Sequence, residues 1–234
     1  MLYEKAFQKG LWEAVRAEKA YAPLLSALLE DYRAVSREGP VSAVRFSEYI
    51  IYQETGSRKK YEAAYFARRK RLNTYALMAL VYPEEWEHLL QLQDTVWAIC
   101  DEYTWALPAH IAWRTGRDPG CIDLFSAETG FALSTIRHLL GDRLHEKMKE
   151  RIDWEINRRI IRPFLYRRFW WEHSNNNWAA VCAGSVGCTF MLSRPRLFSL
   201  IRPRIAFTMR RFLSGFSADG ILSLIHISEP TRPY

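Results

Sequence analysis

Hydrophobic residues recur along this chain at helical spacing, and no stretch alternates for long with the two-residue period of a strand. The clearest case is a stripe in which an apolar side chain returns every fourth residue between charged ones. Its members are Leu144, Met148, Ile152, Ile156 and Ile160. Asp142 is placed to cap this helix and Pro163 to end it. The pattern predicts an amphipathic helix over residues 142–161.

Residues that start or stop helices predict the other elements. Pro83 and the two glutamates after it begin a helix with an apolar face that includes Trp86 and Trp97. Gly141 is placed to end a different helix, the one expected over residues 124–140. Helices are expected over residues 2–35, 46–54, 57–81, 84–105, 124–140, from 175 onward, and 197–213, the last interrupted at Pro203.

The predicted helices differ in how many of their sides are apolar. The helix over 142–161 is amphipathic, as an outer helix should be, whereas those starting near Ser126 and Asn175 are apolar on more sides. The last of these also carries small residues that permit close helix approach. Such alternation favours layered hairpins over a four-helix bundle. We predict an all-α fold, an incomplete α/α toroid of helical hairpins, with residues 86–102, 126–140 and 177–192 in its inner layer.

The amino-acid composition indicates mainly what kind of molecule the protein could bind. Of the 234 residues, 49% are hydrophobic, which is enough for a sizeable core. The 9 Trp, 12 Tyr and 12 Phe can fill that core or line a sugar-binding cleft, where a flat ring stacks on a pyranose. The net charge of +7 attracts polyanions, although a solvated basic face is the simpler interpretation of charge alone.

The cysteines and the N-terminal sequence indicate in which cellular compartment the protein is expected. Cys100, Cys121, Cys182 and Cys188 form no C-x-x-C motif and have no His at metal-ligand spacing, so neither a metal site nor a disulfide framework is expected. The N-terminus lacks the continuous apolar region of a signal peptide. The longest apolar stretch, residues 178–192, is shorter than the roughly 20 residues that span a bilayer. We expect a cytoplasmic protein without a membrane partner.

The C-terminal residues look foreign to the rest of the chain. Residues 222–232 read LSLIHISEPTR, the translation of the transposase-end adapter used in sequencing libraries. An ordinary terminal segment is the alternative, but a match over the whole stretch disfavours it. We therefore expect a partial toroid domain over residues 1–221 and an artefactual tail over 222–234 that packs poorly.

The segment most suggestive of chemistry is residues 170–182, WWEHSNNNWAAVC. Consecutive Asn residues are poor helix formers and good caps, so they mark a loop that turns into a helix. Taken alone, one Asn would cap the helix and the others would be solvated. Beside Trp and His, and before a helix of small residues, these carboxamides instead predict the floor of a cleft with neutral donors.

Four segments, in this order, resemble those of bacterial heparinase II/III-like proteins. They are residues 68–74 (RRKRLNT), 97–110 (WAICDEYTWALPAH), 122–130 (IDLFSAETG) and 175–178 (NNNW). The similarity covers most of residues 45–220. It implies an α/α toroid followed by β-sandwich domains, and cofactor-free cleavage of uronic-acid-containing polysaccharides by β-elimination. Because heparan-type, alginate and other uronides share this chemistry, the expected partner is an acidic polysaccharide or oligosaccharide as a class.

The elimination explains why an Asn is needed. It removes the C5 proton of a uronate and expels the 4-linked oxygen. That proton is weakly acidic beside a charged carboxylate, so a neutral or cationic donor must stabilise the aci-carboxylate that forms. The resemblance places this role on an Asn at the start of an inner helix. Asn177 matches it and is the expected catalytic residue, with Asn176 as the near alternative and a substrate-binding candidate.

Other residues are candidates for substrate binding. Tyr103, Trp105 and His110 lie where a predicted helix ends in a Pro-containing loop, and they could stack on or hydrogen-bond sugar rings. Core packing is the alternative for both Tyr103 and Trp105. Glu128 could orient a substrate hydroxyl or pair with an Arg. The basic cluster at 68–71 could meet an anionic glycan, but a helix points successive residues several ways, so most are expected to be solvated.

The remaining catalytic groups are expected elsewhere. The resemblance implies a Tyr and a His as base and acid, supplied partly by the next inner helix. That helix would begin just after residues 215–220, where the adapter-like sequence takes over, so we expect the Tyr to be missing and this chain to be inactive.

Two other functions stay open. The first is a toroid glycoside hydrolase with two carboxylates chosen from Asp101, Glu102, Asp123 and Glu128. The second is a non-catalytic basic helical module that binds an acidic glycan or nucleic acid. The Asn triplet favours the lyase over the hydrolase. The absence of a nucleic-acid motif weighs against the module, so no nucleic-acid partner is expected.

Overall fold

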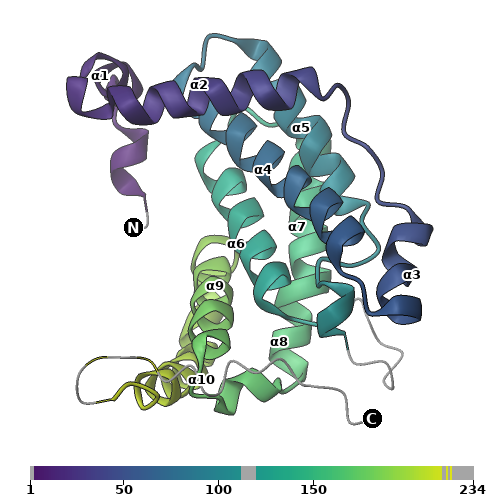
Figure 1. Ribbon diagram of the computed structural model, residues 1–234. Helices are drawn as coiled ribbons and strands as arrows, with labels where there is room; N and C mark the ends of the chain where they lie inside the picture. Colours follow the sequence, from purple (N-terminus) through teal and green to yellow (C-terminus); the bar gives the residue numbers. More distant parts are fainter. Residues whose placement is uncertain (1–2, 112–119, 218–219, 221, 223–234) are drawn as a thin grey trace.

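The computed structural model describes residues 3–111, 120–217, 220 and 222, and these residues form helices and loops without a strand, which confirms the predicted all-α fold (Figure 1). The α-helices are α1 (Leu11–Ala17), α2 (Ala22–Arg37), α3 (Phe46–Thr55), α4 (Lys59–Val81), α5 (Trp86–Cys100), α6 (Leu124–Leu139), α7 (Glu146–Ile156), α8 (Arg162–Tyr166), α9 (Asn177–Ser193) and α10 (Pro195–Leu213). Short 3₁₀ turns lie at Glu4–Phe7, Lys19–Tyr21, Pro108–His110 and Trp170–His173.

Consecutive helices pack as hairpins, and the hairpins stack in two rows. α4 packs on α5, α6 on α7, and α9 on α10. Between hairpins, α4 contacts α6, α6 contacts α9, and α5 contacts α7 (Figure 1). The prediction that residues 86–102 share a layer with α6 and α9 is therefore wrong. α4 takes that place, because it is covered by helices on several sides, whereas α5 keeps Trp86 and Trp97 exposed. Stacked hairpins are the unit of an α/α toroid, and the toroid itself stays a prediction.

The four-residue stripe faces the core as predicted. All of its members are buried: Leu144, Met148, Ile152, Ile156 and Ile160. The helix begins later than predicted, because Nδ1 of His145 accepts the backbone N–H of Lys147 at 3.1 Å and caps α7. Pro163 does not end it. Residues 157–161 widen into a π turn, in which Arg162 N–H donates to the Asn157 carbonyl, and α8 continues beyond the proline.

Two other predicted boundaries are wrong for identifiable reasons. The single helix expected over residues 2–35 is divided by Gly10, which has a φ of 78°, and by a second break before α2. Pro203 does not interrupt α10. Pro203 has no N–H to donate to the carbonyl four residues before it. Because Pro203 lies on an exposed face of the helix, water can hydrogen-bond that carbonyl instead.

α6 packs along α9, and small residues of α6 lie at the contact. A Cβ on Gly130 would lie 3.6 Å from Oγ1 of Thr189 on α9, and 2.6 Å from Cγ1 of Ile160. One turn further along both helices, Oγ of Ser193 lies 3.0 Å from Oγ of Ser134. The two helices therefore run in the same direction and begin at the same end of the molecule. Nothing lies within 4 Å of an added Cβ on Gly184, so the predicted role of the small residues of α9 in close packing stays a prediction.

None of the helices in the described ranges has the length and apolar character that a bilayer crossing requires.

Of the predicted tail, only Leu222 lies within the described residues, where it forms an isolated antiparallel bridge with Phe216. Residues 223–234 lie outside the described residues, so their poor packing stays a prediction.

Candidate functional site

The Asn-rich segment starts α9, and Asn176 is the N-cap of that helix. Its Oδ1 accepts the Trp178 backbone N–H at 3.1 Å, and its own backbone N–H donates to Oγ of Ser174 at 3.3 Å. The residue is 7% exposed. Asn176 therefore has a structural role, because its side chain satisfies an N–H that the first turn leaves open.

Asn177, the first residue of α9, has an open hydrogen-bonding position. Its Oδ1 is buried and has no hydrogen-bond partner within the described part of the chain. A buried polar atom without a partner costs about 1–3 kcal/mol and needs an explanation. Because a carboxamide has an oxygen on one side and an NH₂ on the other, a 180° rotation would present a donor at the same position. A ligand acceptor there would satisfy it.

His110 is held by an aspartate at the start of α6. Its Nδ1 lies 2.8 Å from Oδ2 of Asp123, a residue that is 1% exposed. Asp123 is the N-cap of α6, where its Oδ1 accepts the Ser126 N–H at 2.7 Å, and its Oδ2 also accepts the Leu107 N–H at 3.1 Å. A carboxylate with this many donors favours a proton on Nδ1 of the imidazole. That leaves Nε2 as an acceptor for a substrate group.

The His110 ring connects the starts of α6 and α9. Its centroid lies 5.8 Å from that of Phe125 in a stacked arrangement and 4.7 Å from that of Trp178. Trp178 in turn packs against Trp170, which is 59% exposed. The two helix N-termini, each a centre of positive partial charge, therefore lie together beside aromatic rings that reach solvent. The guanidinium of Arg167 lies against Gly120, just before α6, and adds positive charge there.

The other predicted site residues lie in different surroundings. Glu128, on α6, is exposed, and partial burial of its carboxyl together with the Asp123 charge raises its pKa. Trp105 is 1% exposed and donates its indole N–H to the Ile99 carbonyl at 2.9 Å, so protein atoms cover both ring faces. Tyr103 is 61% exposed and lines a different hollow. The structure places His110 against Trp178, the residue after Asn177, whereas the Trp105 ring is covered by protein and Tyr103 lines another hollow.

The basic cluster at 68–71 is mostly buried, so the prediction that most of it is solvated is wrong. Arg68 and Arg71 are 6% and 4% exposed, and the Arg69 side chain is 14% exposed. The reason is Glu102, whose carboxylate lies 3.0 Å from Nη1 of Arg68 and 2.5 and 2.7 Å from the two terminal nitrogens of Arg69. Only Lys70 behaves as predicted, in an exposed pair with Asp31 at 2.6 Å.

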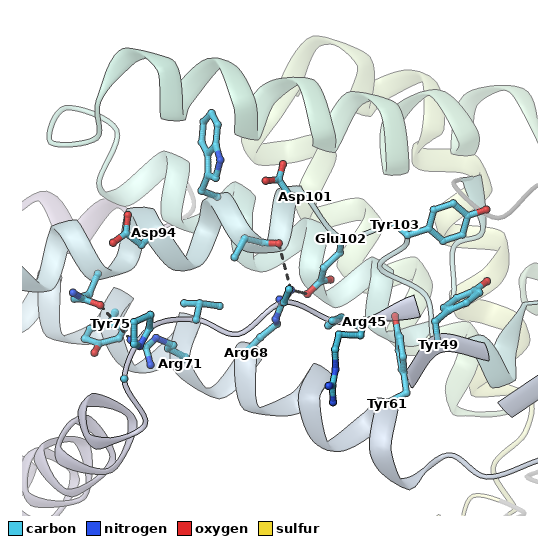
Figure 2. Close-up of a pocket in the computed structure, with 18 of the residues that line it drawn as sticks. Arg45, Tyr49, Tyr61, Arg68, Arg71, Tyr75, Asp94, Asp101, Glu102 and Tyr103 are labelled. Atoms are coloured by element: carbon cyan, nitrogen blue, oxygen red, sulfur yellow. Dashed lines mark hydrogen bonds and ion pairs between the residues drawn. The ribbon is translucent and has the colours of Figure 1, made fainter. Parts of the chain in front are cut away.

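A cleft of 1170 Å³ lies between the segment before α3 and helices α4 and α5. Figure 2 shows Tyr49, Tyr61 and Tyr103 gathered at one end, Arg71 and Tyr75 at the other, and the Arg68–Glu102 pair between them. Sequence reasoning named Tyr103, the basic cluster at 68–71, Asp101 and Glu102 as separate candidates, but it did not bring them into one cleft and did not name Tyr49, Tyr61 or Tyr75. The signal was available in the tyrosines at helical spacing along α4, which could not by themselves be told from core.

Most of the acidic residues considered for hydrolysis are already bonded. Glu102 is tied to two arginines, Asp123 caps α6, and Asp101 lies 2.8 Å from Nη2 of Arg151. Glu128 alone among the four has no such bond in the described ranges. Thiol nucleophiles are disfavoured too, because burial raises the pKa of Cys100 to about 12 and that of Cys182 well above its usual value.

The Asn-rich segment is also fixed from the C-terminal side of α10. A Cβ on Gly215 would lie 2.0 Å from the carbonyl oxygen of Asn175. Gly215→Ala should therefore push α10 and the start of α9 apart and lower the free energy of unfolding by about 1–3 kcal/mol, as measured by urea titration. Gly184→Ala is the control, since nothing lies within 4 Å of an added Cβ on that residue of α9. Equal stability of the two variants would contradict the close contact.

No family model matches the chain, and no curated protein matches it at a significant level. The resemblance to heparinase II/III-like proteins therefore stays a prediction.

Proposed function

We propose that this chain is the toroid part of a polysaccharide lyase that cleaves uronic-acid-containing glycans by β-elimination. Asn177 would hydrogen-bond the uronate carboxylate. The observation that carries the proposal is the carboxamide of Asn177 at the start of α9, whose oxygen has no protein partner in the described part of the chain. The NH₂ of this neutral group can donate to a carboxylate without acting as a competing base.

The surroundings of Asn177 suit an acidic sugar. The paired N-termini of α6 and α9 and the Arg167 guanidinium favour a carboxylate. Trp170 offers an exposed ring face for a pyranose, and Nε2 of His110 is available to a sugar hydroxyl.

In the elimination, a base removes the C5 proton, the bond from C4 to the leaving oxygen breaks, and a double bond forms between C4 and C5. Negative charge moves onto the carboxylate as the C5–H bond breaks. A hydrogen bond from Asn177 to that carboxylate therefore strengthens in the transition state, which is the condition for catalysis.

A glycoside hydrolase is the second candidate, because the raised pKa of Glu128 suits a general acid. Hydrolysis needs a second carboxylate to activate water or attack the sugar. Asp101, Glu102 and Asp123 are each engaged in bonds to the protein, which favours the lyase.

The product distinguishes the candidates. The assay is run on this chain and on a version in which residues 222–234 are replaced by the genomic sequence that follows residue 221. We expect alginate, heparan sulfate or hyaluronan to yield an unsaturated uronide with its ultraviolet absorbance. Reducing ends without that absorbance would replace the lyase by the hydrolase. Binding of acidic glycans without any cleavage would leave a binding module.

A further inference from the structure

The cleft between residues 39–46 and helices α4 and α5 contains a buried cation with an open donor. Arg71 is 4% exposed, and its Nε has no hydrogen-bond partner among the residues that the structure describes. Its terminal nitrogens bond to neutral acceptors, the Val35 carbonyl at 2.9 Å and Oε1 of Gln91 at 3.2 Å. A guanidinium stays charged even when buried, and a buried N–H without an acceptor is costly. Nε itself is covered by protein atoms, so a ligand in the cleft, which Arg71 lines, would meet the guanidinium through its other nitrogens.

The charge of Arg71 is also not matched by a bonded carboxylate within the described ranges. Gln91 stands between Arg71 and the nearest acid, because its Nε2 donates to Oε1 of Glu87 at 2.9 Å. Arg68, the other buried cation of the cleft, differs in that Glu102 neutralises it at 3.0 Å. The cleft therefore has one buried positive charge to offer to a ligand.

The acids around the cleft limit the charge of that ligand. Glu87, Asp94 and Asp101 all line it, and Asp94 is exposed. These carboxylates would repel a dianion such as phosphate more strongly than a monoanion placed at Arg71. A carboxylate group is therefore the best match.

The rest of the cleft is lined by rings. The Tyr75 ring centroid lies 5.1 Å from Cζ of Arg71. At the other end, Tyr49 packs edge-on against Tyr61 at 5.9 Å and against Tyr103 at 5.5 Å (Figure 2). The volume of 1170 Å³ exceeds the roughly 300–1,000 Å³ of most small-molecule sites, so the cleft has room for several rings.

We propose that this cleft binds a ring-containing organic monoanion, with its carboxylate on the guanidinium of Arg71 and its rings along the tyrosines toward Tyr103. A uronic-acid oligosaccharide and an aromatic carboxylic acid both present this chemistry. The site is separate from that of Asn177, since neither Asn177 nor His110 lines the cleft. It does not depend on the proposed lyase activity.

Calorimetric titration of the native chain tests the ligand class. The probes are a hyaluronan disaccharide, which carries one carboxylate, its carboxyl methyl ester, 4-hydroxybenzoate, methyl 4-hydroxybenzoate and inorganic phosphate. We expect one carboxylate to bind, its methyl ester to bind at least about tenfold more weakly, and phosphate not to bind. Binding of the disaccharide identifies a sugar site and binding of 4-hydroxybenzoate an aromatic one. The proposal is overturned if neither carboxylate binds, if acid and ester bind equally, or if phosphate binds as tightly.

Variants locate the binding. Arg71→Gln should weaken carboxylate binding about tenfold to a hundredfold. Lys70→Gln removes the same charge from an exposed neighbour and should leave binding unchanged. Equal losses in the two variants would overturn the assignment to Arg71. If circular dichroism shows that Arg71→Gln does not fold, the comparison of acid with ester and the variant Tyr103→Ala test the binding site instead. Because Tyr103 is exposed, Tyr103→Ala should fold and should weaken binding severalfold. Unchanged binding in Tyr103→Ala would overturn the placement of the ligand rings.

Discussion

Glu102→Gln should lower the free energy of unfolding by about 3–5 kcal/mol. The Glu102 side chain is 2% exposed and lies between the guanidinium groups of Arg68 and Arg69, which are themselves largely covered. Removing its charge leaves two cations in a poorly solvated place, because neither arginine has another bonded carboxylate among the described residues. Urea unfolding followed by circular dichroism measures the loss.

Glu150→Gln is the matched control. Glu150 pairs with Lys147 at 2.8 Å, but both side chains are mostly exposed, so the same substitution should change stability little. The double variant Glu102→Gln with Arg69→Gln should recover part of the loss, since one of the two stranded cations is then absent. A cost for Glu102→Gln no larger than that for Glu150→Gln would show that the buried ion cluster contributes no specific stability.

The same cluster connects the core to the cleft. Arg68 donates from Nε to the Ser42 carbonyl at 3.0 Å, and thereby fixes the segment that forms one wall of the cleft. Arg69 places its guanidinium 3.7 Å from the Tyr65 ring centroid, and the Tyr65 hydroxyl lies 2.9 Å from the Trp105 carbonyl. Glu102 thus orders the cleft wall and the packing beneath the α6 N-terminus together.

Local periodicity explains what the sequence could predict. The stripe from Leu144 to Ile160 was assigned to the core because each member repeats the same helical position, a property of neighbouring residues alone. The residues that cap α6 and α9 could likewise be expected near helix starts. Their meeting required α6 and α9 to run in the same direction, which depends on tertiary contacts such as that of Ser134 with Ser193.

The buried arginines show what local reasoning lacks. Tyr61, Tyr65, Leu72 and Tyr75 follow a helical stripe, and Arg68 occupies a position of that stripe. Placing an arginine in the core is favourable only with a buried partner, and Glu102 lies 34 residues away in sequence. Trp105 failed as a site residue for a similar reason, since its burial depends on distant helices. Periodicity indicates which face is covered, but it does not indicate which charges meet there.

If the proposed elimination is observed, Asn177→Ala should lower kcat by about 10²–10³ and change KM much less. The reason is that the hydrogen bond from the carboxamide strengthens as charge moves onto the uronate carboxylate. Steady-state rates of unsaturated uronide formation, measured over a range of glycan concentrations, separate kcat from KM.

Asn176→Ala distinguishes this role from a structural one. Asn176 caps α9 through the Trp178 N–H, so its loss should cost about 0.5–2 kcal/mol of stability with a much smaller effect on kcat. Asn177→Ala should show the reverse, because Oδ1 of Asn177 has no partner in the described part of the chain and its removal breaks no protein hydrogen bond. Normal elimination by Asn177→Ala would remove Asn177 from the mechanism while leaving the lyase itself in place. A stability loss in Asn177→Ala as large as that in Asn176→Ala would instead mean that the open position on Asn177 is structural.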